Sequence, residues 1–333
     1  MWHAIRYRNL KGGEKMKVIF TVGLPGSGKS TFVKQLAKNE NAIVLSSDAI
    51  RQELFGDSTK QKSRIVFRTL YERLNDLVAK GFSVIVDATN IERERRMFAL
   101  RKIPSTVQKV CYYFDTPYSI CVARNQQRKR HVPLIVMEKM RKHLEFPTVG
   151  EGFNELHIIH ESSPYDLSRQ QFVSLIQGHP TYEELFQTLQ AVPLFKEIYQ
   201  FDQENPFHQF LLCQHTYFVY AYINEYYSES DKLALQIAAL FHDVGKPACK
   251  KYKPLQQRYG YFGHENVSAQ LVCHFLLELG FEKDFVLKVV HLVQFHMLIQ
   301  YGGDRGGSQI YHLLDGDLLT RLYFFREADQ FAK

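Results

Sequence analysis

A nine-residue stretch at positions 23–31, GLPGSGKST, constrains the fold of this 333-residue chain more than any other feature. A β-branched, apolar run at 17–22 precedes it and an amphipathic stretch follows it, which predicts a strand, a loop and a helix in that order. Glycines let such a loop turn sharply and direct its backbone N–H groups at phosphate oxygens. The pattern predicts a triphosphate-binding loop whose candidate ligands are Gly23, Gly26, Ser27, Gly28, Lys29, Ser30 and Thr31.

The strand–loop–helix unit is the first of several. Apolar runs at 17–22, 42–45, 83–87, 109–114 and 156–160 alternate with helical patterns such as 30–38, 63–80 and 134–143. Strands separated by helices predict right-handed crossovers and a parallel sheet covered on both faces. Residues 161–180 are polar and irregular, and a capping box at 181–184 then opens an almost wholly helical remainder. We therefore expect an α/β P-loop domain at 16–160, a linker at 161–180 and an all-α domain at 181–333.

The first fifteen residues fit neither expected domain. A strand begins directly after Met16, and KGGEK at 11–15 corresponds to purine-rich codons, as in a bacterial ribosome-binding site. We expect Met16 to be the natural start and 1–15 to be an extension that is not part of the native protein. A disordered basic arm is the alternative.

Composition narrows the class of protein. No apolar run approaches the roughly 18 residues of a membrane span, and the N-terminus lacks the apolar core of a secretion signal. The five cysteines never form a Cys-x-x-Cys pair, which favours reduced thiols over disulfides or a zinc knuckle. These features predict a cytoplasmic protein without a membrane partner.

Charge is distributed unevenly along the chain. Residues 1–155 hold 28 basic and 15 acidic side chains, a net charge of +13, whereas the remainder has a net charge of −6. A basic half suggests a polyanionic partner such as RNA or DNA, although a solvated basic surface explains the same numbers.

Acidic residues end the second and third predicted strands. Asp48 follows the strand at 42–45, and the carboxyl ends of parallel strands face the ligand crevice, so Asp48 is a candidate general base. Arg51 shares its helical face and could grip a phosphate of the acceptor. Asp87 could hold a magnesium-bound water or orient the acceptor. Either aspartate could instead cap a helix.

A basic segment follows the fourth predicted strand. Arg124 and Arg128 are four residues apart, so on a helix both guanidinium groups could lean over the phosphates as a lid and stabilise the transferring phosphoryl group. The alternative is a solvated basic helix.

These motifs recur, in this order, in phage-type polynucleotide 5′-kinases. The resemblance covers about residues 16–158 and rests on GLPGSGKST, SDAIR at 47–51, VIVDATN at 84–90, ERERR at 92–96 and RNQQR at 124–128 with Val-Pro after it. It implies transfer of the ATP γ-phosphate to a 5′-hydroxyl end of RNA or DNA. It further implies that the residues act as follows: Lys29 and Ser30 on phosphate and Mg²⁺, Asp48 as base, Arg51 on the acceptor phosphate, and Arg124 and Arg128 over the donor.

A second set of motifs lies in the helical half. A predicted helix at 233–241 runs into His242-Asp243, a pair that can reach one divalent ion but is weak evidence alone. His215 lies on an earlier helix, His264 opens a later one, and a further helix carries His291 and His296. We expect His291 to be a core or surface residue and leave His264 and His296 open.

Residues 202–329 resemble the HD phosphohydrolase superfamily, including HD domains that act on RNA ends and those attached to CCA-adding enzymes. The match implies the metal ligands His215, His242, Asp243 and Asp329, with Asp304, Asp315 and Asp317 as competitors for the last position. Such ligands suit Mn²⁺, Co²⁺, Ni²⁺, Zn²⁺ or Mg²⁺. Lys246 would neutralise the scissile phosphate, and His264 or His296 would protonate the leaving group or bind phosphate.

Together the two resemblances predict an RNA end-healing enzyme that uses ATP, Mg²⁺ and a second divalent metal. The first domain would phosphorylate 5′-hydroxyl ends, the second would remove 2′,3′-cyclic or 3′ phosphate, and a separate ligase would seal the product. One alternative is a kinase for small molecules or nucleosides fused to a nucleotide phosphohydrolase. Another is a non-catalytic, RNA-binding or regulatory HD domain.

Overall fold

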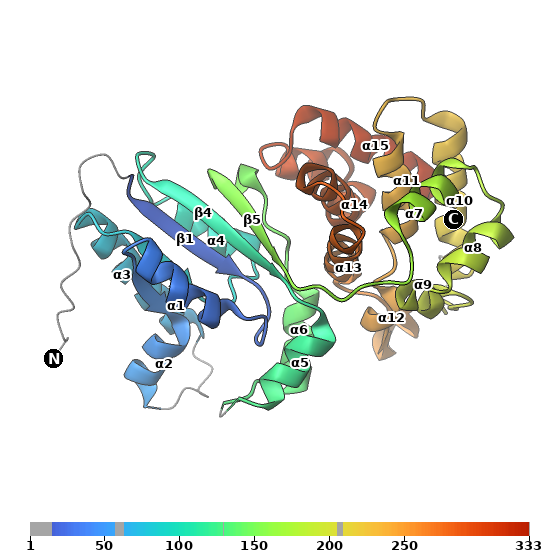
Figure 1. Cartoon of the computed structure of the whole chain (residues 1–333). Coiled ribbons are helices and arrows are strands. Elements are labelled where there is room, and N and C mark those ends of the chain that lie inside the picture. Colours follow the sequence, from blue (N-terminus) through green and yellow to red (C-terminus); the bar gives the residue numbers. More distant parts are fainter. Residues whose placement is uncertain (1–14, 57–62, 129, 205–208, 333) are drawn as a thin grey trace. The chain divides into compact units, whose positions relative to one another are not determined.

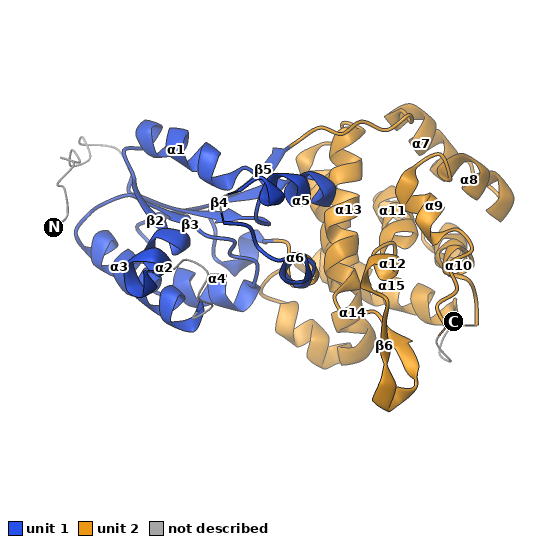
Figure 2. Cartoon of the chain, turned by 90° about the horizontal axis from the view of Figure 1, so that it is seen from below, with its two compact units in different colours: residues 1–140, 147–160 blue, residues 141–146, 161–333 orange. Residues whose placement is uncertain are grey.

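The computed structural model describes residues 15–56, 63–128, 130–204 and 209–332. Figure 2 colours two units separately, one formed by 1–140 with 147–160 and the other by 141–146 with 161–333. The extension expected at 1–15 lies outside the described residues except for Lys15.

The first unit contains a five-stranded parallel sheet, as the alternating pattern predicts (Figure 1). Its order is β2-β3-β1-β4-β5, and its strands are Lys17–Val22 (β1), Ile43–Ser46 (β2), Val84–Asp87 (β3), Gln108–Asp115 (β4) and Glu155–His160 (β5). The helices are Lys29–Asn39 (α1), Ser47–Phe55 (α2), Ser63–Ala79 (α3), Arg93–Leu100 (α4), Tyr118–Gln126 (α5) and Leu134–Lys142 (α6), with a 3₁₀ turn at Val149–Glu151 (η1).

The central strand explains why the sheet is covered on both faces. Five of the six residues of β1 are buried, so side chains of both parities need apolar neighbours. On one face, Val33 of α1 packs in a cluster with Ile19, Ile85 and Val110 from three adjacent strands. Because the chain leaves β1 and β3 toward opposite faces, with α1 on one and α4 on the other (Figure 2), a crevice is expected where these two strands end.

A fully buried ion pair fixes the turn after β3. Arg96 of α4 donates to both carboxylate oxygens of Glu151, at 2.6 and 2.7 Å, and its third contact is the carbonyl of Asn90 at 2.8 Å. Asn90 has a left-handed φ of 45° and donates its side-chain amide to the carbonyl of Thr21, at the end of β1. The ion pair therefore holds the β3 turn against the strand that leads into the phosphate loop.

The second unit is built from helices. They are Arg169–Gln177 (α7), Tyr182–Leu189 (α8), Pro193–Ile198 (α9), Leu212–Tyr226 (α10), Lys232–Phe241 (α11), Lys246–Cys249 (α12), His264–Glu278 (α13), Lys283–Ile310 (α14) and Gly316–Phe331 (α15). Thr181 caps α8 through the predicted capping box with Glu184. None of the described helices is long and apolar enough to cross a membrane. All five cysteines are free and buried.

Three features of this unit differ from the expectation. Residues 161–180 contain α7, which Ser168 caps and which buries Phe172 and Ile176, so this stretch is not an unstructured linker. Residues 141–146 belong to the helical unit because Asn266 and Gln270 of α13 donate to carbonyls of that segment, each at 2.9 Å. A two-stranded hairpin, Lys251–Lys253 (β6) and Arg258–Gly260 (β7) with a 3₁₀ turn at Pro254–Gln256 (η2), interrupts the helices.

Glu151→Ala should destabilise the first unit by about 3–5 kcal/mol, because it leaves the buried Arg96 charge without its carboxylate. Urea unfolding, with hydrogen exchange of the sheet amides as readout, measures the loss for this unit alone. Glu53→Ala is the matched control, since Glu53 also makes a two-oxygen contact with an arginine, Arg73, but on the surface. Its removal should cost less than about 1 kcal/mol. Equal losses in the two variants would contradict the structural role of the buried pair.

Candidate functional site

The phosphate loop joins β1 to α1 with three glycines in conformations that favour glycine. Gly23, Gly26 and Gly28 have φ values of 158°, 85° and 90°, and Gly28 is the N-cap of α1. A Cβ on Gly26 would lie 2.3 Å from the carbonyl oxygen of Cys121, so only glycine fits there without displacing α5. The loop therefore presents backbone N–H groups at a helix N-terminus, which is the arrangement that binds phosphate.

Lys29 is buried at the centre of this loop. Its ammonium donates to the carbonyls of Gly23 and Leu24, at 3.0 and 2.6 Å, and to the hydroxyl of Ser27 at 3.2 Å. Burial lowers the pKa of Lys29 to about 8, although the charge of Asp87 opposes this effect. The loop thus holds a desolvated cation, whose attraction for phosphate is stronger than that of an exposed lysine.

Ser30 and Asp87 meet where β1 and β3 end. The Ser30 hydroxyl donates to Asp87 at 3.0 Å, and burial raises the pKa of Asp87. A hydroxyl and a carboxylate at this spacing offer the oxygen ligands that Mg²⁺ prefers. Asp87 is not a helix cap, because Glu92 is the N-cap of α4.

Asp48 stands in a cluster of guanidinium groups. One of its oxygens accepts from Arg51 at 2.7 Å and from Arg130 at 2.6 Å, and the other lies 3.8 Å from Arg128. The N-cap of α2 is Ser46, so Asp48 is not needed as a cap. Its carboxylate is half-exposed and can exchange an arginine for a substrate hydroxyl.

The basic segment after β4 differs from the predicted helix. α5 ends at Gln126, so Arg124 lies on the helix and is exposed, whereas Arg128 lies beyond its end and faces Asp48. The two arginines are therefore not one turn apart on a single helix. Arg130, to which the sequence analysis gave no role, is the arginine nearest to Asp48. The only sequence signal for it is the density of basic residues at 124–130.

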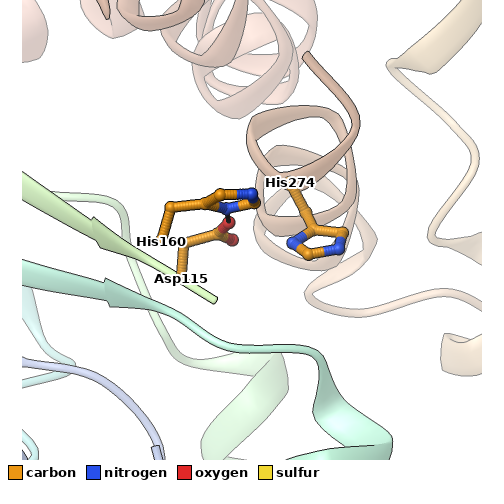
Figure 3. A group of neighbouring side chains, drawn as sticks. All are labelled: Asp115, His160 and His274. Atoms are coloured by element: carbon orange, nitrogen blue, oxygen red, sulfur yellow. Dashed lines mark hydrogen bonds and ion pairs between the residues drawn. The ribbon is translucent and has the colours of Figure 1, made fainter. Parts of the chain in front are cut away.

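The two remaining strands also end in polar residues. Asp115 of β4 and His160 of β5 are register partners, and their side chains point toward each other at 2.6 Å (Figure 3). Polar side chains therefore follow all five strands at the same edge of the sheet.

A second cluster lies inside the helical unit. The His215 Nε2 atom is 3.1 Å from Nε2 of His242, 3.4 Å from Asp243 and 3.2 Å from Asp329, and His242 Nε2 is 3.2 Å from Asp243. All four side chains are buried. The structure thus brings together the four residues for which the sequence suggested metal ligation.

The imidazoles are oriented by backbone carbonyls. The Nδ1 atom of His215 faces the carbonyl of Ala332 at 3.1 Å, and that of His242 faces Ala239 at 2.8 Å. His264 makes the same kind of contact with the carbonyl of Tyr261, just before α13, at 2.8 Å, and His296 with that of Val293, within α14, at 2.6 Å. A carbonyl only accepts, so each Nδ1 carries a proton and each Nε2 is available to the centre, as in metal-bound histidines.

His264 and His296 complete the cluster on the other side of Asp243. Their Nε2 atoms lie 3.0 and 3.9 Å from its second oxygen, and the three residues form a further group close enough to share an ion. The 3.0 Å contact between His264 Nε2 and Asp243 is an ion-pair contact without hydrogen-bond geometry. Lys246 contacts Asp243 at 2.7 Å and is held by the side chain of Gln203, also at 2.7 Å.

The pKa shifts of the imidazoles reflect a buried carboxylate pair. Burial lowers the pKa of His215, but its hydrogen bonds to Asp243 and Asp329 outweigh this effect and raise the pKa to about 9. The pKa of His264 is also raised despite burial, because of Asp243. Burial lowers the pKa of His296 to about 3.

The donor set fits a divalent ion. When both imidazoles are unprotonated at Nε2, their lone pairs 3.1 Å apart repel each other, and a cation between them and the carboxylates removes this repulsion. Asp329 suits the fourth position better than its competitors. Asp315 caps α15, Asp317 is almost fully exposed, and Asp304 is exposed. His291 lies outside the cluster and packs against Phe146.

Two family models match parts of this chain. Residues 18–147 match the family model of the AAA domain, and residues 213–332 match that of the HD domain. The chain therefore consists of a P-loop kinase-like domain followed by an HD domain, which confirms the combination expected from the motifs.

Individual relatives cover parts of the chain. A CC-adding tRNA nucleotidyltransferase of Thermus thermophilus is 36% identical over 30% of this chain and 23% of its own length. An adenylyl-sulfate kinase of Buchnera aphidicola is 30% identical over 36% of this chain and 60% of its own length. This chain thus spans less than two thirds of each of these two relatives.

Two solved structures are similar to part of the chain. A chain of the Pnkp1/Rnl/Hen1 RNA repair complex is 26% identical, with a TM-score of 0.36, over 39% of this chain and 44% of that one. The APS kinase CysC of Mycobacterium tuberculosis is 23% identical, with a TM-score of 0.33, over 44% of this chain and 91% of that one.

At pH 7, metal binding to the helical unit should release at least one proton. His215, with its pKa raised to about 9, is then largely protonated and must lose that proton to ligate through Nε2. The apparent affinity for Mn²⁺ should therefore rise with pH up to about 9. Calorimetric titration in buffers of different ionisation enthalpy counts the released protons.

Two variants make this titration specific. His215→Asn should weaken binding and reduce the proton release, whereas His312→Asn, which changes an exposed histidine outside the cluster, should do neither. The same proton release in His215→Asn as in the unmodified chain would contradict the role of His215.

Proposed function

We propose that the chain is a bifunctional nucleic-acid end-healing enzyme. Its P-loop domain phosphorylates 5′-hydroxyl ends with ATP, and its HD domain removes 2′,3′-cyclic or 3′ phosphate. The proposal depends most on the cluster of Arg51, Arg128 and Arg130 around Asp48, beside the phosphate loop. This cluster places a proton acceptor among cations that fit an acceptor bearing phosphates.

The residues of the first site divide the phosphoryl transfer among them. Lys29 and the loop amides bind the ATP phosphates, and Ser30 and Asp87 hold Mg²⁺, which neutralises charge on the transferring group. The 5′ oxygen attacks the γ-phosphorus while the bond to the bridging oxygen of ADP breaks. Asp48 takes the proton of the attacking hydroxyl. Arg51 binds the acceptor's phosphate, and Arg124 and Arg128 stabilise the negative charge on the donor.

Charge supports a polymeric acceptor. The net charge of +13 on residues 1–155 exceeds what one nucleotide needs, and it suits a strand with several phosphates. RNA and DNA share this chemistry, so both are candidate substrates.

The second site suits phosphate ester hydrolysis. His215, His242, Asp243 and Asp329 would hold a divalent metal, which would supply activation of water and polarisation of the phosphoryl oxygen. Lys246 neutralises the phosphate. His264, whose pKa is raised, donates a proton to the leaving oxygen. His296, with a pKa of about 3, is neutral and binds the phosphate.

The products of the two proposed reactions indicate a partner enzyme. Both products together, a 5′ phosphate and a free 3′ end, are what an RNA ligase joins, so a separate ligase is the expected partner. Five free cysteines favour a reducing compartment, which supports the cytoplasm.

A small-molecule acceptor is the second candidate function. The likeness to an adenylyl-sulfate kinase over 132 residues favours it, because related P-loop kinases phosphorylate hydroxyls of small acceptors. The HD domain would then hydrolyse nucleotides.

Transfer of labelled γ-phosphate from ATP to a panel of acceptors distinguishes the two candidates. We expect kcat/KM to be highest for 5′-hydroxyl RNA or DNA oligonucleotides, because only they can engage several cations at once. Adenylyl sulfate, nucleosides and sugars are the comparison. Faster phosphorylation of any of these than of both oligonucleotides would overturn the polynucleotide assignment.

The two activities should be separable by single substitutions. Lys29→Ala should lower phosphorylation at least about 100-fold and leave hydrolysis of a 2′,3′-cyclic phosphate end intact, because each site lies within its own unit. Asp243→Asn should have the opposite effect, since it removes the carboxylate that contacts both metal-binding histidines. Both activities are measured on each variant with added Mn²⁺ or Ni²⁺.

Matched controls exclude a general effect of charge. Lys34→Ala removes an exposed lysine from the same helix as Lys29, and Asp317→Asn changes an exposed aspartate of the helical unit. Neither should alter either activity. If Asp243→Asn left hydrolysis unchanged while Lys29→Ala abolished it, the HD domain would not be the phosphohydrolase.

A further inference from the structure

The β6–β7 hairpin is a basic element in an otherwise acidic half of the chain. Residues 247–263 contain four basic and no acidic side chains, whereas residues 156–333 have a net charge of −6. The hairpin projects from the helices of its unit (Figure 2), and all three residues of β6 are exposed. The charges of Lys251 and Lys253 are therefore available to an external anion.

The strand register sorts the hairpin into two faces. Tyr252 pairs with Tyr259, and their rings lie 5.3 Å apart. Lys253 pairs with Arg258 on the opposite face, and Lys251 lies on that face as well, because side chains alternate along a strand. One face is thus aromatic and the other, which we call the basic face, consists of Lys251, Lys253 and Arg258.

The two lysines of the basic face lack a neutralising carboxylate, whereas Arg258 donates to the side chain of Gln256 at 3.2 Å. Like charges directly opposite each other in a hairpin are destabilising, and Lys253 and Arg258 are such a pair. Among the described residues, no acidic side chain forms an ion pair with Lys251 or Lys253. An anion bound across the strands would relieve the repulsion, and the two-residue spacing of Lys251 and Lys253 suits successive phosphates of an extended strand.

The fourth basic residue has a different role. Lys250 pairs with Glu204, donates to the carbonyl of Asp202 at 3.1 Å and lies 4.6 Å from the centre of the Tyr259 ring. These contacts fix the base of the hairpin to the body of its unit. The aromatic face is therefore anchored and the basic face is left outward.

The base of the hairpin also borders the HD-domain site. α12 begins with Lys246 and leads directly into β6, and β7 is followed within four residues by His264. Tyr261, between β7 and His264, has its ring 5.7 Å from the Lys246 ammonium and donates its hydroxyl to the carbonyl of Gln203. Gln203 in turn binds Lys246 through its side chain. Both strands thus run outward from residues that contact Asp243.

We propose that the basic face of the hairpin binds the phosphodiester backbone of a single-stranded nucleic acid whose 3′ end enters the HD-domain site. This inference rests on the phosphohydrolase function proposed above and makes an oligonucleotide its preferred substrate over a free nucleotide. The hairpin acts in binding and takes no part in the chemistry.

The test compares a polymeric and a monomeric substrate on the full, metal-loaded chain. Lys251→Gln/Lys253→Gln should raise KM for an RNA oligonucleotide ending in 2′,3′-cyclic phosphate several-fold and leave kcat unchanged. The slope of log KM against log salt should fall by about 1.4, because each lost contact on a single strand contributes about 0.7. Hydrolysis of a 2′,3′-cyclic mononucleotide should be unaffected.

Lys196→Gln/Arg305→Gln is the matched control. It removes the same charge from exposed positions of α9 and α14. It should leave both substrates unaffected. An unchanged oligonucleotide KM in the hairpin variant, an equal rise in the control, or an equal loss with the mononucleotide would each overturn the proposal.

A cross-linking measurement keeps this inference separate from the proposed function. RNA containing 4-thiouridine is irradiated with the full chain, and mass spectrometry locates the cross-linked peptides. Cross-links within 250–262 that disappear in the hairpin variant would support the binding role even if the wild-type chain hydrolysed neither substrate. Absence of cross-links within 250–262 would overturn the proposed binding of nucleic acid. An acidic protein surface would then be the partner of the basic face.

Discussion

The helical unit is organised around one buried carboxylate, that of Asp243. A charge out of water is costly unless it is paired and hydrogen-bonded, so the surrounding helices must each present a partner in the right place. Five residues are such partners: His215 of α10, His242 directly after α11, Lys246 of α12, His264 of α13 and His296 of α14. Asp329 of α15 reaches the cluster through His215. The packing of these helices therefore determines which residues form the site. The charges nearest to Asp243 hold its pKa well below the usual range.

The sheet unit positions its residues by a different means. Parallel strands all end at one edge, and polar residues placed directly after them converge without any requirement for a charged centre. A buried ion pair acts behind the site and not within it: the Arg96–Glu151 pair supports the turn that follows Asp87. Consequently Asp48 of the nucleotide site is half-exposed among three arginines, whereas the ligands of the helical site are buried.

Sequence patterns predicted the helices and strands better than they predicted which residues lie close together in the fold. The strands and the phosphate loop could be predicted because apolar periodicity and glycine positions are local signals. α7 was missed because its four apolar residues, of which Phe172 and Ile176 are buried, form one short group within a mostly polar stretch. The arginines around Asp48 were only partly predicted, since the end of α5 at Gln126 depends on tertiary packing. Likewise, no spacing along the chain indicates that His296 lies on the same carboxylate as His264.

The contact between His215 and the carbonyl of Ala332 joins two residues that are 117 positions apart. On a ribosome, the sheet unit has all its strands once residue 160 has emerged, but the histidine cluster lacks its last helix and this carbonyl until α15 is made. At about 5–20 residues per second, the roughly 170 intervening residues take on the order of 10–30 s. During that interval a nascent chain can fold its nucleotide site and bind ATP. Its metal site is still incomplete, because Ala332, whose carbonyl orients the His215 imidazole, has not yet been synthesised.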